Sequence, residues 1–177
     1  AGQSKEVTVT ATITKGTETL TKEFKITVGE LSISTIAEVH ALPANSYVKV
    51  KGIVIAKSKS ANFGNAQVYI QDATGGIQAF RATGADADKI EVGDEVIWEG
   101  HTSTYLGKSQ FAAPSETVVN KLVEVVSENN TLPTAAVITE KAQLNDAILK
   151  LGTATGYLKE AFTTPAGGSY YTFVLAN

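Results

Sequence analysis

Three stretches decide the fold: Tyr47-Val-Lys-Val-Lys-Gly-Ile-Val-Ile, Ala66-Gln-Val-Tyr-Ile-Gln-Asp-Ala-Thr-Gly-Gly-Ile-Gln-Ala-Phe and Val92-Gly-Asp-Glu-Val-Ile-Trp-Glu-Gly. They alternate apolar with polar residues and are rich in Val and Ile, which is typical of β-strands. Gly52 interrupts the first strand, where a glycine suits a sharp bend or a bulge. Asp72-Ala-Thr-Gly-Gly supplies a hairpin turn, and Gly93-Asp94 a tight reversal. Together these signals predict the skeleton of a small closed β-barrel.

The neighbouring sequence completes this barrel and adds short helices. Thr35 is placed to cap a helix over 36–42, which Pro43 ends. We expect residues 84–90 to form a short connection between two strands. We expect strands at about 47–57, 66–72, 76–82, 94–103 and 108–113, with a further extended stretch near 117–125. The predicted class is therefore all-β, a five-stranded barrel with short helices.

Two flanking regions lie outside the barrel. Residues 5–28 alternate apolar residues with Thr and predict a hairpin that turns near Gly16. Residues 127–133 form a polar break, after which 139–149 has helical spacing, and strands follow near 151–158 and 170–175. Gly52 and Gly156 lie 104 residues apart, which suggests that 134–177 repeats the start of the barrel. The alternative is that the last strands pair with the N-terminal hairpin or extend the first barrel.

Composition limits the function classes. The chain has 177 residues, a net charge of −3, no cysteine and no methionine. Disulfides and thiolate metal sites are therefore excluded, and no apolar run approaches the roughly 20 residues that span a membrane. The missing initial methionine suggests a mature or trimmed piece. A dedicated nucleic-acid binder usually has a basic surplus, whereas residues 33–125 hold eight Lys and Arg against ten Asp and Glu.

The candidate binding face comprises the outward positions of the second and third barrel strands. Val68, Ile70, Ile77 and Ala79 are expected to face the interior, and their neighbours to face out. Tyr69 and Phe80 then form a platform on which a base or a sugar ring can stack, unless a neighbouring domain or the 36–42 helix covers them. The full candidate set is Lys49, Lys51, Phe63, Tyr69, Gln71, Gln78 and Phe80.

No catalytic or metal-binding constellation is recognisable. His40 and His101 are the only histidines and have no partner at ligand spacing. Asp86 and Asp88 form a pair that calcium could use, but a solvated loop is the favoured interpretation. Trp98 is expected to pack in the core. We therefore expect no enzyme activity, no metal and no cofactor.

Residues 33–126 resemble the OB-fold modules of secreted or surface-attached bacterial multidomain proteins. The likeness rests on Val50-Lys-Gly-Ile-Val, Tyr69-Ile-Gln-Asp-Ala-Thr-Gly-Gly-Ile, Val92-Gly-Asp-Glu-Val, Glu99-Gly, Tyr105-Leu-Gly and Gln110-Phe. Residues 1–29 resemble the last two strands of a bacterial immunoglobulin-like repeat. The resemblance implies a Greek-key barrel that binds oligonucleotides or oligosaccharides on the face of its second and third strands, and an extracellular or cell-surface location.

Three functions follow as hypotheses. The first is a non-catalytic binding or spacer module of an exported bacterial surface protein with an unknown ligand. Its candidate partners are neighbouring domains of the same polypeptide, a glycan or a single-stranded nucleic acid. The second is a single-stranded nucleic-acid-binding accessory module of a secreted nuclease. The third is a carbohydrate-binding module, for which an acidic surface is no obstacle because a sugar stacks on aromatic rings without needing cations.

Overall fold

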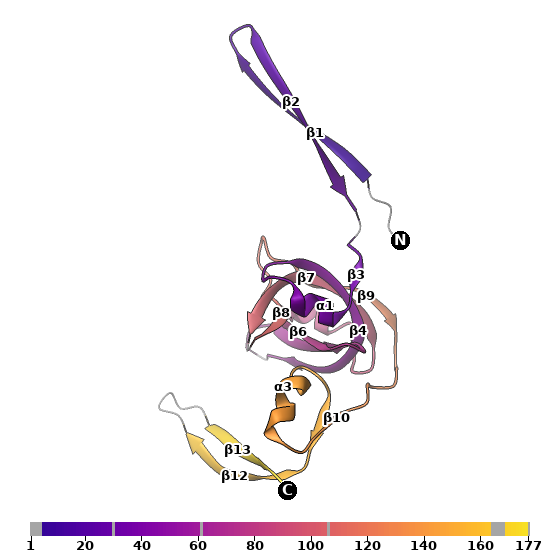
Figure 1. Cartoon of the computed structure of the whole chain (residues 1–177), viewed down its shortest axis with the longest axis vertical. Helices are drawn as coiled ribbons and strands as arrows, with labels where there is room; N and C mark the ends of the chain where they lie inside the picture. The colour runs from indigo at the N-terminus through magenta and orange to yellow at the C-terminus, as the bar shows by residue number, and fades with distance from the viewer. Residues whose placement is uncertain (1–4, 30, 61, 106, 164–168, 177) are drawn as a thin grey trace. The chain divides into compact units, whose positions relative to one another are not determined.

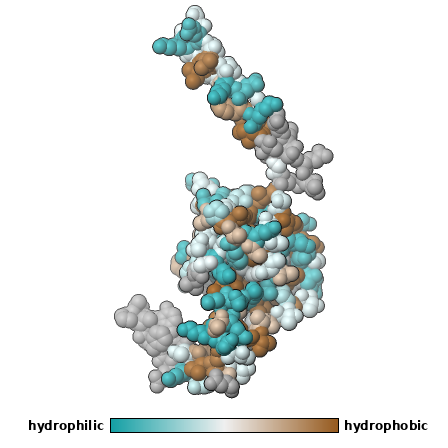
Figure 2. All heavy atoms as spheres, viewed as in Figure 1, coloured by the Kyte–Doolittle hydropathy of each residue, from teal (hydrophilic) through white to brown (hydrophobic). Residues whose placement is uncertain are grey.

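A computed structural model describes residues 5–29, 31–60, 62–105, 107–163 and 169–176. The chain divides into two compact units, residues 1–33 and 34–177. The first unit is an antiparallel hairpin of β1 (Lys5–Lys15) and β2 (Glu18–Val28), which reverses at Gly16 with φ of 63°. The predicted hairpin is thus confirmed. Apolar side chains remain exposed on it (Figure 2), among them Ile13 and Leu20.

The second unit is built around a closed barrel (Figure 1). Its strands are β4 (Tyr47–Lys59), β5 (Asn65–Gln71), β6 (Gly76–Thr83), β7 (Glu95–Tyr105) and β8 (Lys108–Phe111). They follow the order β4-β5-β6-β8-β7, and β4 also pairs with β7, which closes the ring. The β6–β8 contact is parallel and the other pairings are antiparallel. A sixth strand, β9 (Asn120–Ser127), pairs with β7. The all-β class and the five-stranded barrel predicted from the sequence are confirmed.

The bend at Gly52 is what lets β4 belong to two ladders. Residues 47–53 of β4 pair with β7, and residues 53–59 pair with β5. A Cβ atom at Gly52 would lie 2.6 Å from the backbone oxygen of Gln71. A side chain here would push β5 away, so the close approach of β4 and β5 at this point requires a glycine.

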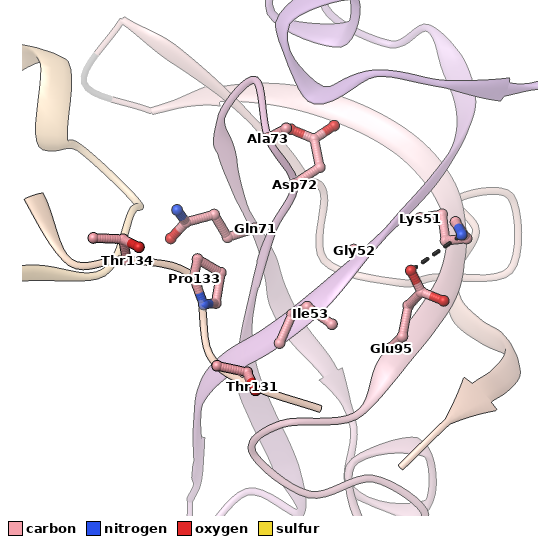
Figure 3. A pocket seen from close by; sticks show the side chains of 10 residues that line it. All are labelled: Lys51, Gly52, Ile53, Gln71, Asp72, Ala73, Glu95, Thr131, Pro133 and Thr134. Atoms are coloured by element: carbon pink, nitrogen blue, oxygen red, sulfur yellow. Dashed lines mark ion pairs between the residues drawn. The ribbon is translucent and has the colours of Figure 1, made fainter. Parts of the chain in front are cut away.

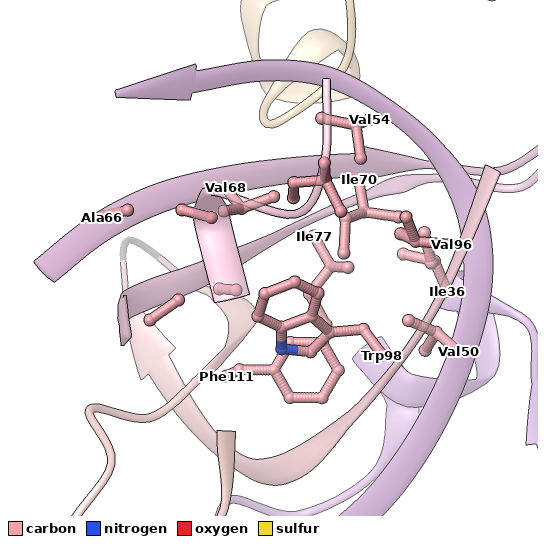
Figure 4. Close-up of a cluster of buried hydrophobic side chains, with 14 of the residues drawn as sticks. Ile36, Val50, Val54, Ala66, Val68, Ile70, Ile77, Val96, Trp98 and Phe111 are labelled. Carbon is pink, nitrogen blue, oxygen red and sulfur yellow. The ribbon is translucent and has the colours of Figure 1, made fainter. Parts of the chain in front are cut away.

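The interior is filled by the inward residues of every barrel strand and by α1 (Ile36–Ala41), which contributes Ile36 and Val39. Trp98 and Phe111 lie side by side in this core (Figure 4) and are fully buried, as predicted for Trp98. The indole Nε1 of Trp98 donates to Asn120 Oδ1 at 2.7 Å. Asn120 Nδ2 in turn donates to the backbone oxygens of Phe80 and Ala112, each at 2.9 Å. One amide therefore satisfies the buried indole and ties three segments together.

The hairpin turn between β5 and β6 also holds α1. Asp72 Oδ1 accepts the backbone N–H groups of Thr74 and Gly75 at 2.7 and 2.8 Å, while its Oδ2 accepts Ile36 N–H at 2.8 Å. Thr35 caps the helix, and the Glu38 carboxylate accepts a hydrogen bond from the Thr35 backbone N–H, which completes a capping box. The predicted Thr35 cap is confirmed. Asp72 both forms the turn and binds the first residue of α1.

Short elements complete the chain. The connections near the barrel contain β3 (Ile33–Ser34) and α2 (Gly84–Ala87). Beyond the barrel come β10 (Ala136–Ile138), η1 (Lys141–Gln143), α3 (Leu144–Ala147), β11 (Gly152–Ala154), β12 (Gly156–Thr163) and β13 (Ser169–Leu175). β10 and β11 are parallel, and β12 and β13 form a separate two-stranded sheet. The helix expected over 139–149 is shorter than predicted, because the chain leaves helical geometry after Ala147 and Leu149 has φ of 64°.

Candidate binding face

The outward side chains of four barrel strands surround a hollow of about 550 Å³, here called the aromatic hollow. β5 and β6 place their inward residues Val68, Ile70, Ile77 and Ala79 in the core, fully buried. Their neighbours lie on the opposite face of the strands, where Tyr69 and Phe80 are half-buried and Gln78 is buried. β7 and β8 complete the wall. The lining residues are Gln67, Tyr69, Gln78, Phe80, Tyr105 and Gln110.

Hydrogen bonds fix the amides of this hollow. Gln78 Nε2 donates to Gln67 Oε1 at 2.7 Å and to the Tyr69 hydroxyl oxygen at 3.4 Å. Gln110 Nε2 donates to Ser103 Oγ at 3.2 Å. A polar group held in one orientation binds a ligand with little further loss of conformational entropy. The hollow therefore offers aromatic faces beside positioned amides, the two kinds of group that recognise planar or hydroxylated ligands.

Positive charge stands at the edges of the hollow. Among the described residues that line it, none is charged. The Arg81 guanidinium lies 5.2 Å from the centre of the Phe80 ring, which is cation–π distance. Lys108 begins β8 and lines the adjoining space. In the described part of the chain, neither of these two cations forms an ion pair.

Several carboxylates of the barrel lie elsewhere and pair with lysines. Glu99 binds both Lys49 and Lys121, at 3.6 and 3.1 Å, across neighbouring strands. These lysines and a hydrogen bond with Tyr47 hold the pKa of Glu99 below its usual range against the opposing effect of burial. Further ion pairs join Lys51 to Glu95, Lys57 to Glu91 and Lys59 to Asp88. The net negative charge of the barrel is thus kept away from the lining of the aromatic hollow.

The structure brings together only part of the candidate set. Tyr69, Gln78 and Phe80 line one hollow. Lys49 and Lys51 do not add charge there, because each pairs with a glutamate of β7. The remaining two candidates also lie outside the hollow. Phe63 lies in the β4–β5 loop with 78% of its side chain exposed, and Gln71 is buried with its Oε1 accepting Leu151 N–H at 2.7 Å.

A second hollow, of about 530 Å³, lies where β4 bends at Gly52 (Figure 3). Lys51, Gln71, Asp72 and Glu95 line it together with the 131–134 segment. Its polar groups are already engaged: Glu95 pairs with Lys51 at 3.1 Å, and Asp72 binds the start of α1. This hollow therefore belongs to the structural contact between the barrel and the chain that follows it.

Sequence reasoning missed Gln67, Tyr105 and Gln110. The alternation that placed Tyr69 outward also places Gln67 outward, so that residue could have been found. Gln110 becomes a neighbour of β6 only through the parallel Ala79–Phe111 pairing. Such long-range pairings are not encoded in local periodicity, and the position of Tyr105 follows from the same closure.

Both histidine rings form hydrogen bonds with backbone groups. His40 Nε2 lies 3.0 Å from the Gly76 carbonyl oxygen, and its Nδ1 accepts Ser109 N–H at 3.2 Å. Burial lowers the pKa of His40, which keeps the ring neutral and suits this pair of bonds. His101 Nδ1 accepts Val119 N–H at 3.0 Å. Asp86 accepts from Thr83 at the start of α2, and Asp88 pairs with Lys59.

Two further findings concern only the residues that the structure describes. No group of three or more His, Cys, Asp or Glu there could hold a metal ion. No helix in those ranges is both long and apolar enough to cross a membrane.

The fold and the hollow define a closed β-barrel with a candidate ligand-binding face. The chain is similar to Endonuclease YhcR of Bacillus subtilis (strain 168), with 24% identity over 131 residues. The aligned region is 71% of this chain and 10% of that protein. The chain thus corresponds to about a tenth of this relative. No family model and no solved structure matches the chain.

Proposed function

We propose that this chain is a non-catalytic module that binds single-stranded nucleic acid in the aromatic hollow, as the accessory part of a nuclease. The observation that carries the proposal is the lining itself: Tyr69, Phe80 and Tyr105 beside three glutamine amides. Aromatic faces stack with bases, and amides bond their edges. The likeness to a protein named as an endonuclease supports this choice over the spacer hypothesis.

The charge pattern supports a ligand held mainly by stacking. Arg81 and Lys108 lie at the edges of the hollow, while Glu95 and Glu99 of β7 pair with lysines of β4. Two phosphate contacts on a single strand correspond to a slope of about −1.4 in log K against log salt. We therefore expect binding in the range of about 1 to 100 μM that depends weakly on salt. Export to the cell surface stays a prediction from the sequence.

Fluorescence anisotropy with a labelled ten-residue thymidine oligonucleotide tests the proposal. Tyr69→Ala removes one stacking face and is expected to weaken binding about five- to 150-fold, as loss of about 1–3 kcal/mol per base requires. Phe63→Ala is the matched control, because Phe63 is an exposed aromatic outside the hollow. No binding at about 100 μM protein would overturn the proposal, as would equal effects of the two substitutions.

Two further measurements separate the competing functions. A glycan array with the wild type and Tyr69→Ala tests carbohydrate binding, which the uncharged lining also suits. Glycan binding that Tyr69→Ala abolishes, without oligonucleotide binding, would replace the proposal by the carbohydrate hypothesis. Incubation of the chain with single-stranded DNA and divalent cations tests catalysis, and cleavage above background would contradict a non-catalytic role.

A further inference from the structure

The segment 146–151, here called the docking segment, lies against the barrel near the aromatic hollow. Leu151 N–H donates to Gln71 Oε1 at 2.7 Å, and Lys150 N–H donates to the Ala147 oxygen at 3.0 Å. This contact requires a glycine at position 76, because a Cβ atom there would overlap the backbone oxygen of Leu149. The buried Gln71 therefore acts as an anchor for the docking segment.

The docking segment extends the aromatic hollow. A middle hollow of about 160 Å³ shares Tyr69, Gln78, Tyr105 and Gln110 with it and is closed by Ile148 and Leu149. An end hollow of about 220 Å³ then shares Lys108 and Ile148 with the middle one. Each hollow shares lining residues with the next, so the three lie in a row, here called the track.

The chemistry changes along this track. The aromatic hollow has no charged lining residue among those described, whereas Lys108, Lys150 and Asp146 line the end hollow. His40 adds no charge because burial lowers its pKa, and both of its ring nitrogens face backbone partners. The end hollow thus carries a net charge of +1. In the described chain, neither Lys108 nor Lys150 forms an ion pair.

We propose that the docking segment completes the binding site and that the end hollow takes a phosphate of the bound strand between Lys108 and Lys150. The inference rests on the proposed function, because it needs a ligand with a base on Tyr69. The strand then runs from Phe80, past Tyr69, to Lys150. Its phosphate meets two ammonium groups that form no ion pair in the described chain, and the Asp146 carboxylate in the same lining leaves a net charge of +1.

Lys150→Ala in the full chain is the direct test, with the labelled thymidine oligonucleotide as probe. It is expected to weaken binding about two- to fivefold at low salt, as for a partly exposed ion pair, and to make the salt slope shallower by about 0.7. Lys141→Ala is the matched control, because it removes the same charge from the exposed surface of η1. The control is expected to leave the salt slope unchanged.

Gly76→Ala provides a second and independent test. The added methyl group must displace the Leu149 carbonyl, so binding is expected to weaken while the midpoint of Trp98 fluorescence in urea reports whether the barrel stays folded. Equal behaviour of Lys150→Ala and Lys141→Ala, with Tyr69→Ala still defective, would overturn the inference and leave the proposed function standing. Absence of oligonucleotide binding by the wild type would overturn both.

Discussion

The hairpin β4–β5 of the barrel and the later hairpin β12–β13 share one geometry but differ in burial. In each, a glycine crowds the backbone oxygen of the partner strand, Gln71 for Gly52 and Val174 for Gly156. In each, one cross-strand apolar pair precedes a register shift, Val54–Ile70 and Leu158–Phe173. The first pair is fully buried, whereas Leu158 is 63% and Phe173 48% exposed.

The difference in exposure between the two pairs shows that burial depends on strands outside the hairpin. The preceding elements are alike only in part: β3 and α1 precede the first hairpin, whereas β10, η1, α3 and β11 precede the second. The barrel, however, adds β6, β7 and β8, whose inward residues Ile77, Trp98 and Phe111 cover the first pair. A two-stranded sheet cannot bury its own apolar face. Hairpin geometry is therefore set locally by glycine and register, while burial depends on closure by distant strands.

The largest expected contrast is between the two apolar pairs. Ile70→Ala is expected to lower the free energy of unfolding of the barrel by about 3 kcal/mol, because it leaves a cavity in a fully buried site. Phe173→Ala is expected to change it by less than about 0.5 kcal/mol, as at an exposed site. Urea unfolding followed by Trp98 fluorescence measures both. Equal losses would mean that β13 is part of the barrel core.

The two glycines give the next contrast. Gly52→Ala forces a Cβ atom against Gln71 at the point where β4 passes from one ladder to the other, and is expected to cost about 1–3 kcal/mol in the same unfolding experiment. Gly156→Ala creates a similar overlap in a separate sheet. We expect it to loosen the β12–β13 pairing, seen as faster amide hydrogen exchange, without moving the Trp98 transition. A shift of that transition would contradict the separation.

The smallest contrast concerns the helices before the two hairpins. Each has a capping box, with Glu38 bonded back to Thr35 and Gln143 bonded back to Glu140. Backbone and side-chain hydrogen bonds from Thr35 lower the pKa of Glu38. A lowered carboxyl pKa contributes stability above the unfolded pKa, and this is lost as the pH falls through the folded pKa. Gln143 does not titrate.

The Thr35 amide proton should therefore shift on acidification, with a midpoint below the pKa of an ordinary glutamate. NMR spectra recorded during acidification measure the shift, and Glu38→Gln is the control that removes the step at Thr35. A titration of the Thr35 amide that persists in Glu38→Gln would show that another group is responsible.

Much of the barrel could be predicted from local sequence. Alternation placed Val68, Ile70, Ile77 and Ala79 inward, and each strand lay within a few residues of its predicted ends. This works because the side-chain period of a strand is a local property. Gly52 could be assigned to a bend for the same reason, because a glycine inside a Val-rich strand has few other uses.

The site could be predicted only in part, because long-range pairing decides it. Tyr69, Gln78 and Phe80 lie together since they belong to one hairpin. Gln71 was predicted as a binding residue but anchors Leu151, 80 residues later. Lys49 and Lys51 meet glutamates of β7 only after the β4–β7 ladder closes the ring. Single-strand patterns carry no information on such partners.

The Asn120 amide restricts how this barrel can diverge in evolution. It accepts one bond from the Trp98 indole and donates two to main-chain oxygens. An aspartate lacks the donors, and a leucine would leave the indole N–H and both oxygens unpaired. Descendants that keep this barrel should therefore change positions 98 and 120 together or keep both. A homologue that lost Asn120 alone must have found another partner for the indole.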